Sequence, residues 1–251
     1  MRVLALDTTT AAGSVAIVDD EGVFIEEISD PARSHAERMP GDILHALDRV
    51  SVALDSIDLF AVAVGPGTFT GLRIGIATIQ GLAFVNRKRI VPVSALTALA
   101  VAASHEEPAG RIVGAWMDAH RHDVFSALFR RTEASPFDPD GLIEMEGPAV
   151  GDPLTTLTRW EHAGHTPDVL VGDGAIMFAA GIPTEISTLG QLPLAAVIGR
   201  MALARARAGD TVDPAGVQPL YVRRPDAEIA RDALQQGENV KPNAQSLKPK
   251  A

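Results

Sequence analysis

The first turn of the sequence combines one carboxylate with three hydroxyl groups. Asp7 is followed by Thr8, Thr9 and Thr10, between the apolar runs VLAL and SVAIV. Such a hairpin turn can present hydroxyls and backbone N–H groups to a phosphate, with the aspartate near a metal ion or an attacking water. The same residues can also do no more than close a tight hairpin, since aspartate and threonine are both common in turns. Spacing alone leaves both interpretations open.

Two glycine-containing turns could bind an anion. The first is GPGTFTGLRIG, residues 65–75, where glycine permits unusual backbone angles and the N–H groups of the following helix attract anions, with Arg73 in its first turn. No Gly-Lys-Ser or Gly-Lys-Thr follows, so this is not a P-loop. The second turn is Gly172, Asp173 and Gly174 after an apolar run, and its shortness favours a plain turn over a phosphate loop.

The histidines do not predict a metal site. His120 and His122 flank Arg121 in an expected hairpin turn, with no third ligand nearby. The chain has no cysteine, which excludes disulfides, thiolate metal sites and cysteine nucleophiles. There is no His-Glu-x-x-His motif and no nucleophile elbow. The sequence therefore predicts neither a bound metal nor a recognisable catalytic set.

Short strands and helices must position these turns. Residues 2–7, 14–18 and 23–28 predict an antiparallel meander, and Ser34 with Glu37 predicts a capped helix start. Strands and helices then alternate through residues 60–64, 72–84, 90–93 and 95–103. A weaker version of the same order recurs through residues 111–119, 124–129, 154–161, 168–173 and 194–208. This duplication predicts an α/β protein with two mixed sheets covered by helices.

The expected lobes follow from that duplication. We place an N-terminal lobe over residues 1–107, a C-terminal lobe over residues 108–236, and a disordered tail over residues 237–251, where apolar periodicity is absent.

Composition excludes several classes of protein. The 251 residues are 46% hydrophobic, enough to bury a sizeable core. The formal net charge of −10 argues against a free-standing nucleic-acid binder, because that affinity comes from cations that neutralise phosphates. No signal peptide and no run of eighteen uncharged apolar residues is present, so we expect a cytoplasmic protein with no membrane contact.

Two successive helices carry more apolar residues than one packing seam requires. The helix after the first glycine turn is small-sided, with Gly71, Gly75 and Gly81, so another helix could approach it closely. Excess apolar surface of this kind predicts a subunit interface. The residues we expect in it are Met39, Ile43, Leu47, Phe69, Leu72, Arg73, Ile76 and Ile79.

Several motifs together resemble one bacterial family. DTTT with GSVAIV, SHAER, AVAVGPGTFTGLRIG, VSALTALA, MDAHRHDVFSALF and PLYVRRPDAE are similar to TsaB, formerly YeaZ, over most of the chain up to about Glu228. The resemblance implies the two-lobed fold of actin, sugar kinases and heat-shock ATPases, with a ribonuclease-H-like sheet in each lobe. It also implies a non-catalytic subunit of the tRNA threonylcarbamoyladenosine machinery, which binds and activates the transferase TsaD and works with the ATPase TsaE.

The resemblance bears on cofactors and partners as well. Positions matching the metal-binding histidines of the catalytic paralogue fall on Ala95 and Leu99, which cannot bind metal. Asp7 to Thr10 would match the first phosphate segment of the fold, and Gly172 to Gly174 the second. ADP or ATP could lie in such a degenerate cleft or near the partner. We further expect tRNA to be bound mainly through partners, and the chain to form a homodimer when alone.

Two other functions stay open from the sequence. One is a small-molecule kinase or ATPase of the same fold, which Asp7 and the two glycine turns would serve. The other is a metallopeptidase-like hydrolase, which requires a bound metal.

Overall fold

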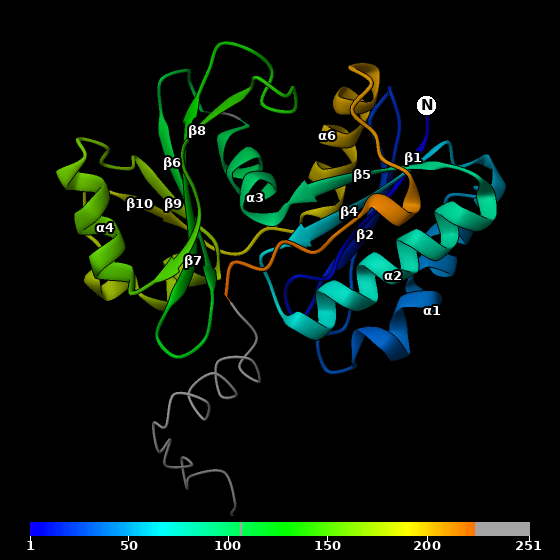
Figure 1. The fold of residues 1–251 in the computed structure, drawn as a ribbon, viewed down its shortest axis with the longest axis horizontal. Helices are drawn as coiled ribbons and strands as arrows, with labels where there is room; N and C mark the ends of the chain where they lie inside the picture. Colours follow the sequence, from blue (N-terminus) through cyan, green and yellow to red (C-terminus); the bar gives the residue numbers. More distant parts are fainter. Residues whose placement is uncertain (106, 224–251) are drawn as a thin grey trace, which may run out of the picture.

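Two five-stranded sheets form the framework of the chain. The computed structural model describes residues 1–105 and 107–223. Each sheet consists of an antiparallel three-stranded meander extended by two parallel strands, and the two sheets lie in separate lobes (Figure 1). Within the described residues, no helix is long and apolar enough to cross a membrane.

The first sheet has the strand order β3-β2-β1-β4-β5. Its strands are β1 (Val3–Asp7), β2 (Ser14–Val18), β3 (Val23–Ile28), β4 (Leu59–Gly65) and β5 (Arg89–Ser94). Helices α1 (His35–Arg49), α2 (Phe69–Asn86) and α3 (Ala95–Ser104) follow β3, β4 and β5 respectively. The predicted meander and helix starts are confirmed, since Ser34 N donates to Glu37 Oε2 at 2.9 Å and the Ser94 hydroxyl caps α3.

The second sheet repeats this order as β10-β9-β6-β7-β8. Its strands are β6 (Ile112–Asp118), β7 (Val124–Arg131), β8 (Leu142–Gly151), β9 (Val169–Val171) and β10 (Ser187–Leu189). Helices α4 (Pro153–His162), α5 (Asp173–Met177) and α6 (Ala195–Arg207) again follow the third, fourth and fifth strands. The duplication therefore makes β6 the counterpart of β1, α4 of α1 and α5 of α2.

Alternate residues of β1 supply two different cores. Leu4 and Leu6 pack beneath α1 and α2, whereas Val3 and Ala5 face the opposite side of the sheet. All five β1 residues are buried, as expected for a central strand covered on both faces.

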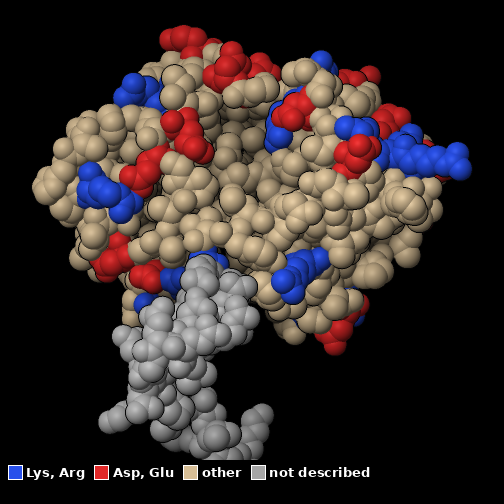
Figure 2. Space-filling model, in the orientation of Figure 1, with Lys and Arg blue, Asp and Glu red and all other residues tan. Residues whose placement is uncertain are grey.

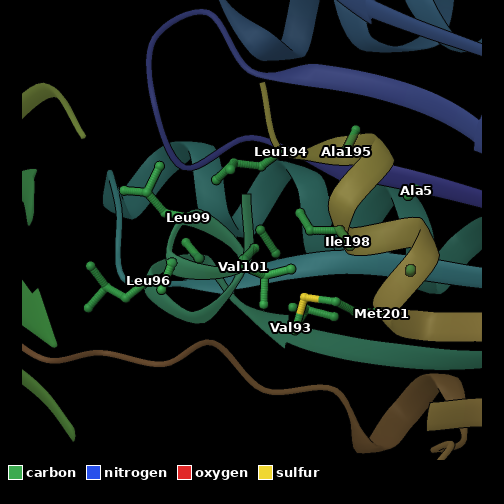
Figure 3. Close-up of a cluster of buried hydrophobic side chains, with 14 of the residues drawn as sticks. Ala5, Val93, Leu96, Leu99, Val101, Leu194, Ala195, Ile198 and Met201 are labelled. Atoms are coloured by element: carbon green, nitrogen blue, oxygen red, sulfur yellow. The ribbon is translucent and has the colours of Figure 1, made fainter. Parts of the chain in front are cut away.

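The core on the far side of the first sheet joins the two lobes. It includes Val93 of β5, Leu96 of α3, Ile198 and Met201 of α6, and Val113 of β6. Figure 3 shows the side chains of α3 and α6 gathered beside Val93. Helix α6 thus contacts β1, β2 and β4 although its residues fall in the range assigned to the C-terminal lobe, while α3 contacts β6 and β7. The lobe boundary at residues 107 and 108 stays a prediction, and residues 237–251 lie outside the described part of the chain.

Candidate functional site: an interlobe hollow and a helical face

Asp7 is turned into its own hairpin at the end of β1. Its carboxylate accepts hydrogen bonds from the backbone N–H of Thr9 at 2.9 Å and from the Thr9 hydroxyl at 2.7 Å. Only 2% of Asp7 is exposed, and this burial raises the pKa of Asp7, an effect partly offset by the bonds from Thr9. His35 Nε2 lies 2.9 Å from the carbonyl oxygen of Thr10, which it serves as donor. The turn is thus held by its own residues and by α1.

Arg38 of α1 holds the other half of that turn. Its guanidinium donates to the carbonyl oxygens of Ala11, Ala12 and Asp30, with 2.8 Å to Ala11, and it also lies 2.8 Å from His35 Nδ1. Nδ1 accepts this bond because Nε2 carries the proton, and burial lowers the pKa of His35. Arg38 is only 2% exposed. The SHAER run therefore ties α1 to the β1–β2 turn.

The glycines of α2 let that helix lie directly on the same turn. A Cβ placed on Gly71 would stand 2.2 Å from the Thr8 carbonyl oxygen, and one on Gly67, in the turn before α2, would stand 2.7 Å from the Thr9 Cα. A Cβ on Gly75 would stand 2.2 Å from the Thr8 hydroxyl oxygen, which is buried and has no hydrogen-bond partner among the described residues. The first glycine turn therefore packs against the DTTT turn.

The second glycine turn is equally close-packed. Gly172 has a φ of +120°, and a Cβ there would stand 2.0 Å from the Trp116 carbonyl oxygen. The Asp173 carboxylate accepts the N–H of Asp118 at 2.8 Å and that of Gly174 at 2.9 Å. Burial raises the pKa of Asp173, and the charge of Asp118 adds to the increase. This turn fastens α5 to the end of β6.

The duplicated topology shows which turns of the two lobes correspond. Gly172–Gly174 joins β9 to α5, so its counterpart is the GPGTFTG turn between β4 and α2. The counterpart of the DTTT turn is the β6–β7 turn, residues 119–123, which follows Asp118. The resemblance matched Asp7–Thr10 to the first phosphate segment and Gly172–Gly174 to the second, whereas the strand order, which is visible only in the fold, gives these two turns different places in their sheets.

A hollow of about 430 Å³ lies where the two lobes meet. It is bounded by the β4–α2 turn, the β6–β7 turn and residues 220–223, and neither Asp7 nor Gly172–Gly174 lines it. The residues that define its walls are Pro66, Phe69, Asp118, Arg121, Phe125, Tyr221 and Arg223. Asp118, Tyr221 and Arg223 were missed as site residues, although the single tyrosine of the chain in the PLYVRRPDAE motif was a usable signal.

The apolar residues expected at a subunit interface belong instead to the internal core. Exposure is 5% or less for Met39, Ile43, Leu47, Leu72, Ile76 and Ile79. Five of them pack in the cluster between α1, α2 and the first sheet, and Leu72 is likewise buried. The interface prediction is therefore wrong for these six residues, because the apolar stripes of α1 and α2 pack against the sheet. Phe69 and Arg73 remain exposed, with Phe69 at 41%.

The outward faces of α1 and α2 carry a different apolar set. Leu44 is 65% exposed on α1, and Phe84 and Val85 are 76% and 78% exposed on α2. Gly41 and Gly81 also face outward, with nothing within 4 Å of an added Cβ. Arg73 is the one charged residue of α2, and Figure 2 shows an extended uncharged surface over this part of the first lobe.

Comparison with known proteins identifies the family. A protein from Escherichia coli named tRNA threonylcarbamoyladenosine biosynthesis protein TsaB is 30% identical over 192 residues, which are 72% of this chain and 82% of that protein. The chain belongs to the TsaB family. A TsaB from Haemophilus influenzae is 38% identical over 139 residues, covering 55% of this chain and 58% of the relative. The alignment to a Mycobacterium leprae relative spans 56% of that protein's length.

Solved structures support the fold of this TsaB-family chain. YeaZ from Pseudomonas aeruginosa matches with a TM-score of 0.70 and 29% identity, over 88% of this chain and 99% of that one. The two-lobed, actin-like fold that the resemblance implied is confirmed. The family model described as TsaD, tRNA N6-adenosine threonylcarbamoyltransferase, matches residues 23–137, which include α1, α2 and α3. Sequence similarity to the transferase thus covers the helices of the first lobe.

Proposed function

We propose that this chain is a scaffold subunit that binds and activates TsaD for threonylcarbamoyl transfer to the tRNA adenosine beside the anticodon. Its named relatives act in tRNA threonylcarbamoyladenosine biosynthesis, as their names state. In this proposal the chain contributes a docking surface and no catalytic residue, metal or cofactor of its own.

The outward face of α1 and α2 is the observation that carries the proposal. The two helices lie side by side on one face of the first sheet. The face exposes the large apolar side chains of Leu44, Phe84 and Val85 to water. Burial of these side chains against a partner would lower the free energy of the complex.

Two glycines on that face also support the proposal. Gly41 and Gly81 lie inside helices, where glycine costs roughly 0.5–1 kcal/mol relative to alanine. Neither is required by packing within the chain, since an added Cβ would meet nothing within 4 Å at either position. Small residues on an outward helical face let the backbone of a partner approach closely. We therefore place the partner contact on the outward residues Pro40, Gly41, Leu44, Phe69, Arg73, Ala77, Gly81, Phe84 and Val85.

The two other functions that the sequence left open have weaker support. A kinase or ATPase would use Asp7, whose carboxylate is 2% exposed and bonded to Thr9. A metallopeptidase would need ligands at Ala95 and Leu99, whose side chains are apolar and fully buried in α3. ATP turnover that Asp7→Ala abolishes would favour the first, and stoichiometric bound metal would favour the second.

The remaining partners belong to the same proposal. TsaE would join through the complex with TsaD, tRNA would be held mainly by subunits other than this acidic chain, and ADP or ATP would bind in or near the complex. Without TsaD, the same apolar face would pair with a second copy of this chain.

Size-exclusion chromatography with light scattering tests the proposal. The chain would be run alone and mixed with TsaD from the same organism, and the fractions assayed for tRNA modification. We expect a homodimer that exchanges into a heterodimer, with modification restored only by the complex. A chain that stays monomeric beside TsaD would refute the proposal.

A further inference from the structure

The C-terminal segment of the described chain crosses from one lobe to the other. Its first anchor lies in the N-terminal lobe, after the short 3₁₀ turn Pro214–Gly216. Gln80 of α2 donates to the carbonyl oxygens of Pro214 at 2.7 Å and Val217 at 3.2 Å. Val217 is 2% exposed and belongs to the core beneath α1 and α2. This end of the segment is thus fixed to the first lobe.

The middle of the segment is fitted to the end of β4. Leu220 donates its N–H to the Val64 carbonyl oxygen at 2.7 Å. A Cβ on Gly65 would stand 2.7 Å from the Leu220 carbonyl oxygen, and Gly65 has a φ of +119°, which other residues rarely adopt. Glycine at position 65 therefore lets the segment lie against the strand.

Tyr221 forms a third contact with the first lobe. Its ring stacks on Phe69 with 5.4 Å between centroids and 25° between planes. Its hydroxyl accepts a hydrogen bond from Arg73 Nε at 3.0 Å, and the Arg73 guanidinium lies 3.8 Å from the Phe69 ring centre. The three side chains form one connected group.

Arg223 reaches the second lobe. It donates to the Ala119 carbonyl oxygen at 2.7 Å and forms an ion pair with Asp123. Both partners lie in the β6–β7 turn, where residues 120–122 all have φ values between 58° and 66°. Non-glycine residues seldom occupy this region, and they remain there where surrounding contacts hold them. Arg223 supplies such contacts at both ends of the turn.

These anchors lie at one edge of the core that the lobes share, where Val222 of the segment packs against that core and Ala119 belongs to it. The shared core is built from α3, α6 and both sheets. The segment crosses at the interlobe hollow, whose walls include Phe69, Tyr221, Arg223 and the β6–β7 turn; in Figure 1 its orange ribbon passes between α2 and β7. Two lobes joined by one shared core can hinge about it, so the polar and aromatic contacts that Tyr221 and Arg223 add at its edge restrain the hinge.

We propose that residues 217–223 act as an interlobe clasp that fixes the angle between the lobes and the width of the hollow. The chain's own side chains set that angle, and no nucleotide is needed to close the lobes. The inference concerns the isolated chain and does not depend on binding to TsaD.

Distance measurement between two spin labels tests the clasp. Because the chain has no cysteine, Asp48→Cys on α1 and Glu161→Cys on α4 would place one label on each lobe of the full chain. We expect one narrow distance distribution that Mg-ATP leaves unchanged. Adding Tyr221→Ala and Arg223→Ala should at least double the width of the distribution. Two results would overturn the proposal. One is a distribution of unchanged width in the double variant, and the other is a shift of the label distance when Mg-ATP is added to the protein with an intact clasp.

Two further variants control for general damage. Arg159→Ala removes an arginine ion pair with Glu146 that lies within the second lobe alone, so the distribution should stay narrow. If the double variant fails to fold, Arg223→Gln replaces it as the test, because this substitution removes only the charge of the anchor to the second lobe. Amide exchange at residues 119–123 should then quicken at least tenfold while exchange in β4 stays unchanged. Equal exchange in that turn with and without Arg223 would contradict the clasp.

Discussion

Gly71 of α2 lies directly over Thr8, so that a methyl group added to the glycine would stand 2.2 Å from the Thr8 carbonyl oxygen. The obstructing atom belongs to the backbone of a buried turn, which cannot rotate aside. In contrast, Gly81 on the same helix faces outward with nothing within 4 Å. Packing within the chain therefore requires glycine at position 71 and does not require it at position 81.

Alanine at these two positions should act in opposite directions. Gly71→Ala should lower the free energy of unfolding by about 2 kcal/mol or more, because α2 must move off the turn. Gly81→Ala should raise it by about 0.5–1 kcal/mol, because alanine favours the helix. Urea unfolding of both variants measures the two effects, and a loss of stability in Gly81→Ala would contradict the outward placement.

Asp7→Asn should stabilise the isolated chain, and this effect should grow as pH rises. Burial raises the pKa of Asp7 in the folded state, so the fold binds a proton that the unfolded chain releases. Stability that depends on the protonated form is therefore present below the ordinary carboxyl pKa and lost as pH rises through the raised value. Asparagine stays neutral and its side-chain oxygen can still accept the hydrogen bonds from Thr9. The melting temperature of the variant should therefore exceed that of the natural chain, and the difference should be largest at neutral pH. A constant difference from pH 4 to pH 8 would refute this.

Arg38→Met should destabilise the first lobe. Methionine keeps an aliphatic stem but leaves the carbonyl oxygens of Ala11, Ala12 and Asp30 without their donor. A hydrogen bond from a charged donor contributes about 1.5–3 kcal/mol and solvent can reach part of these carbonyls, so for the three bonds we expect a loss of about 3 kcal/mol. Thermal unfolding measures it, with the surface variant Arg49→Met as the control. A loss no larger than that of the control would show that the arginine does not hold the turn.

Ile76→Asp should unfold the chain instead of only separating subunits. Ile76 is 5% exposed and lies in the core beneath α2, where an unpaired carboxylate has no partner. Circular dichroism should show loss of cooperative unfolding in this variant, and Ile43→Asp should behave alike. A folded but monomeric Ile76→Asp would restore the interface that the sequence suggested.

Local patterns predicted much of the fold. The Ser34–Glu37 capping pair and the alternation in β1 and β2 depend on neighbouring residues, so sequence alone identified them. Strand β8 was missed: no element was predicted between residues 129 and 154, because Glu144, Glu146 and Pro148 are typical of a loop. It forms at the sheet edge by pairing with β7, where one side of the strand faces water.

The candidate sites depended on longer-range information. Helical spacing located the apolar stripe that contains Ile43 and Ile76, but only the position of the sheet shows that this stripe is internal. The contacts of Tyr221 and Arg223 join residues about 100 or more positions apart, and no local pattern encodes them.

A matched pair of leucine substitutions tests the docking surface most directly. Leu44 on α1 and Leu154 on its counterpart α4 are both exposed, at 65% and 50%. Binding of TsaD to Leu44→Asp and Leu154→Asp would be measured by titration calorimetry. We predict at least about a 30-fold loss of affinity for Leu44→Asp, as for an interface residue worth about 2 kcal/mol, and no change beyond about twofold for Leu154→Asp. Full affinity in folded Leu44→Asp would contradict the proposed scaffold surface.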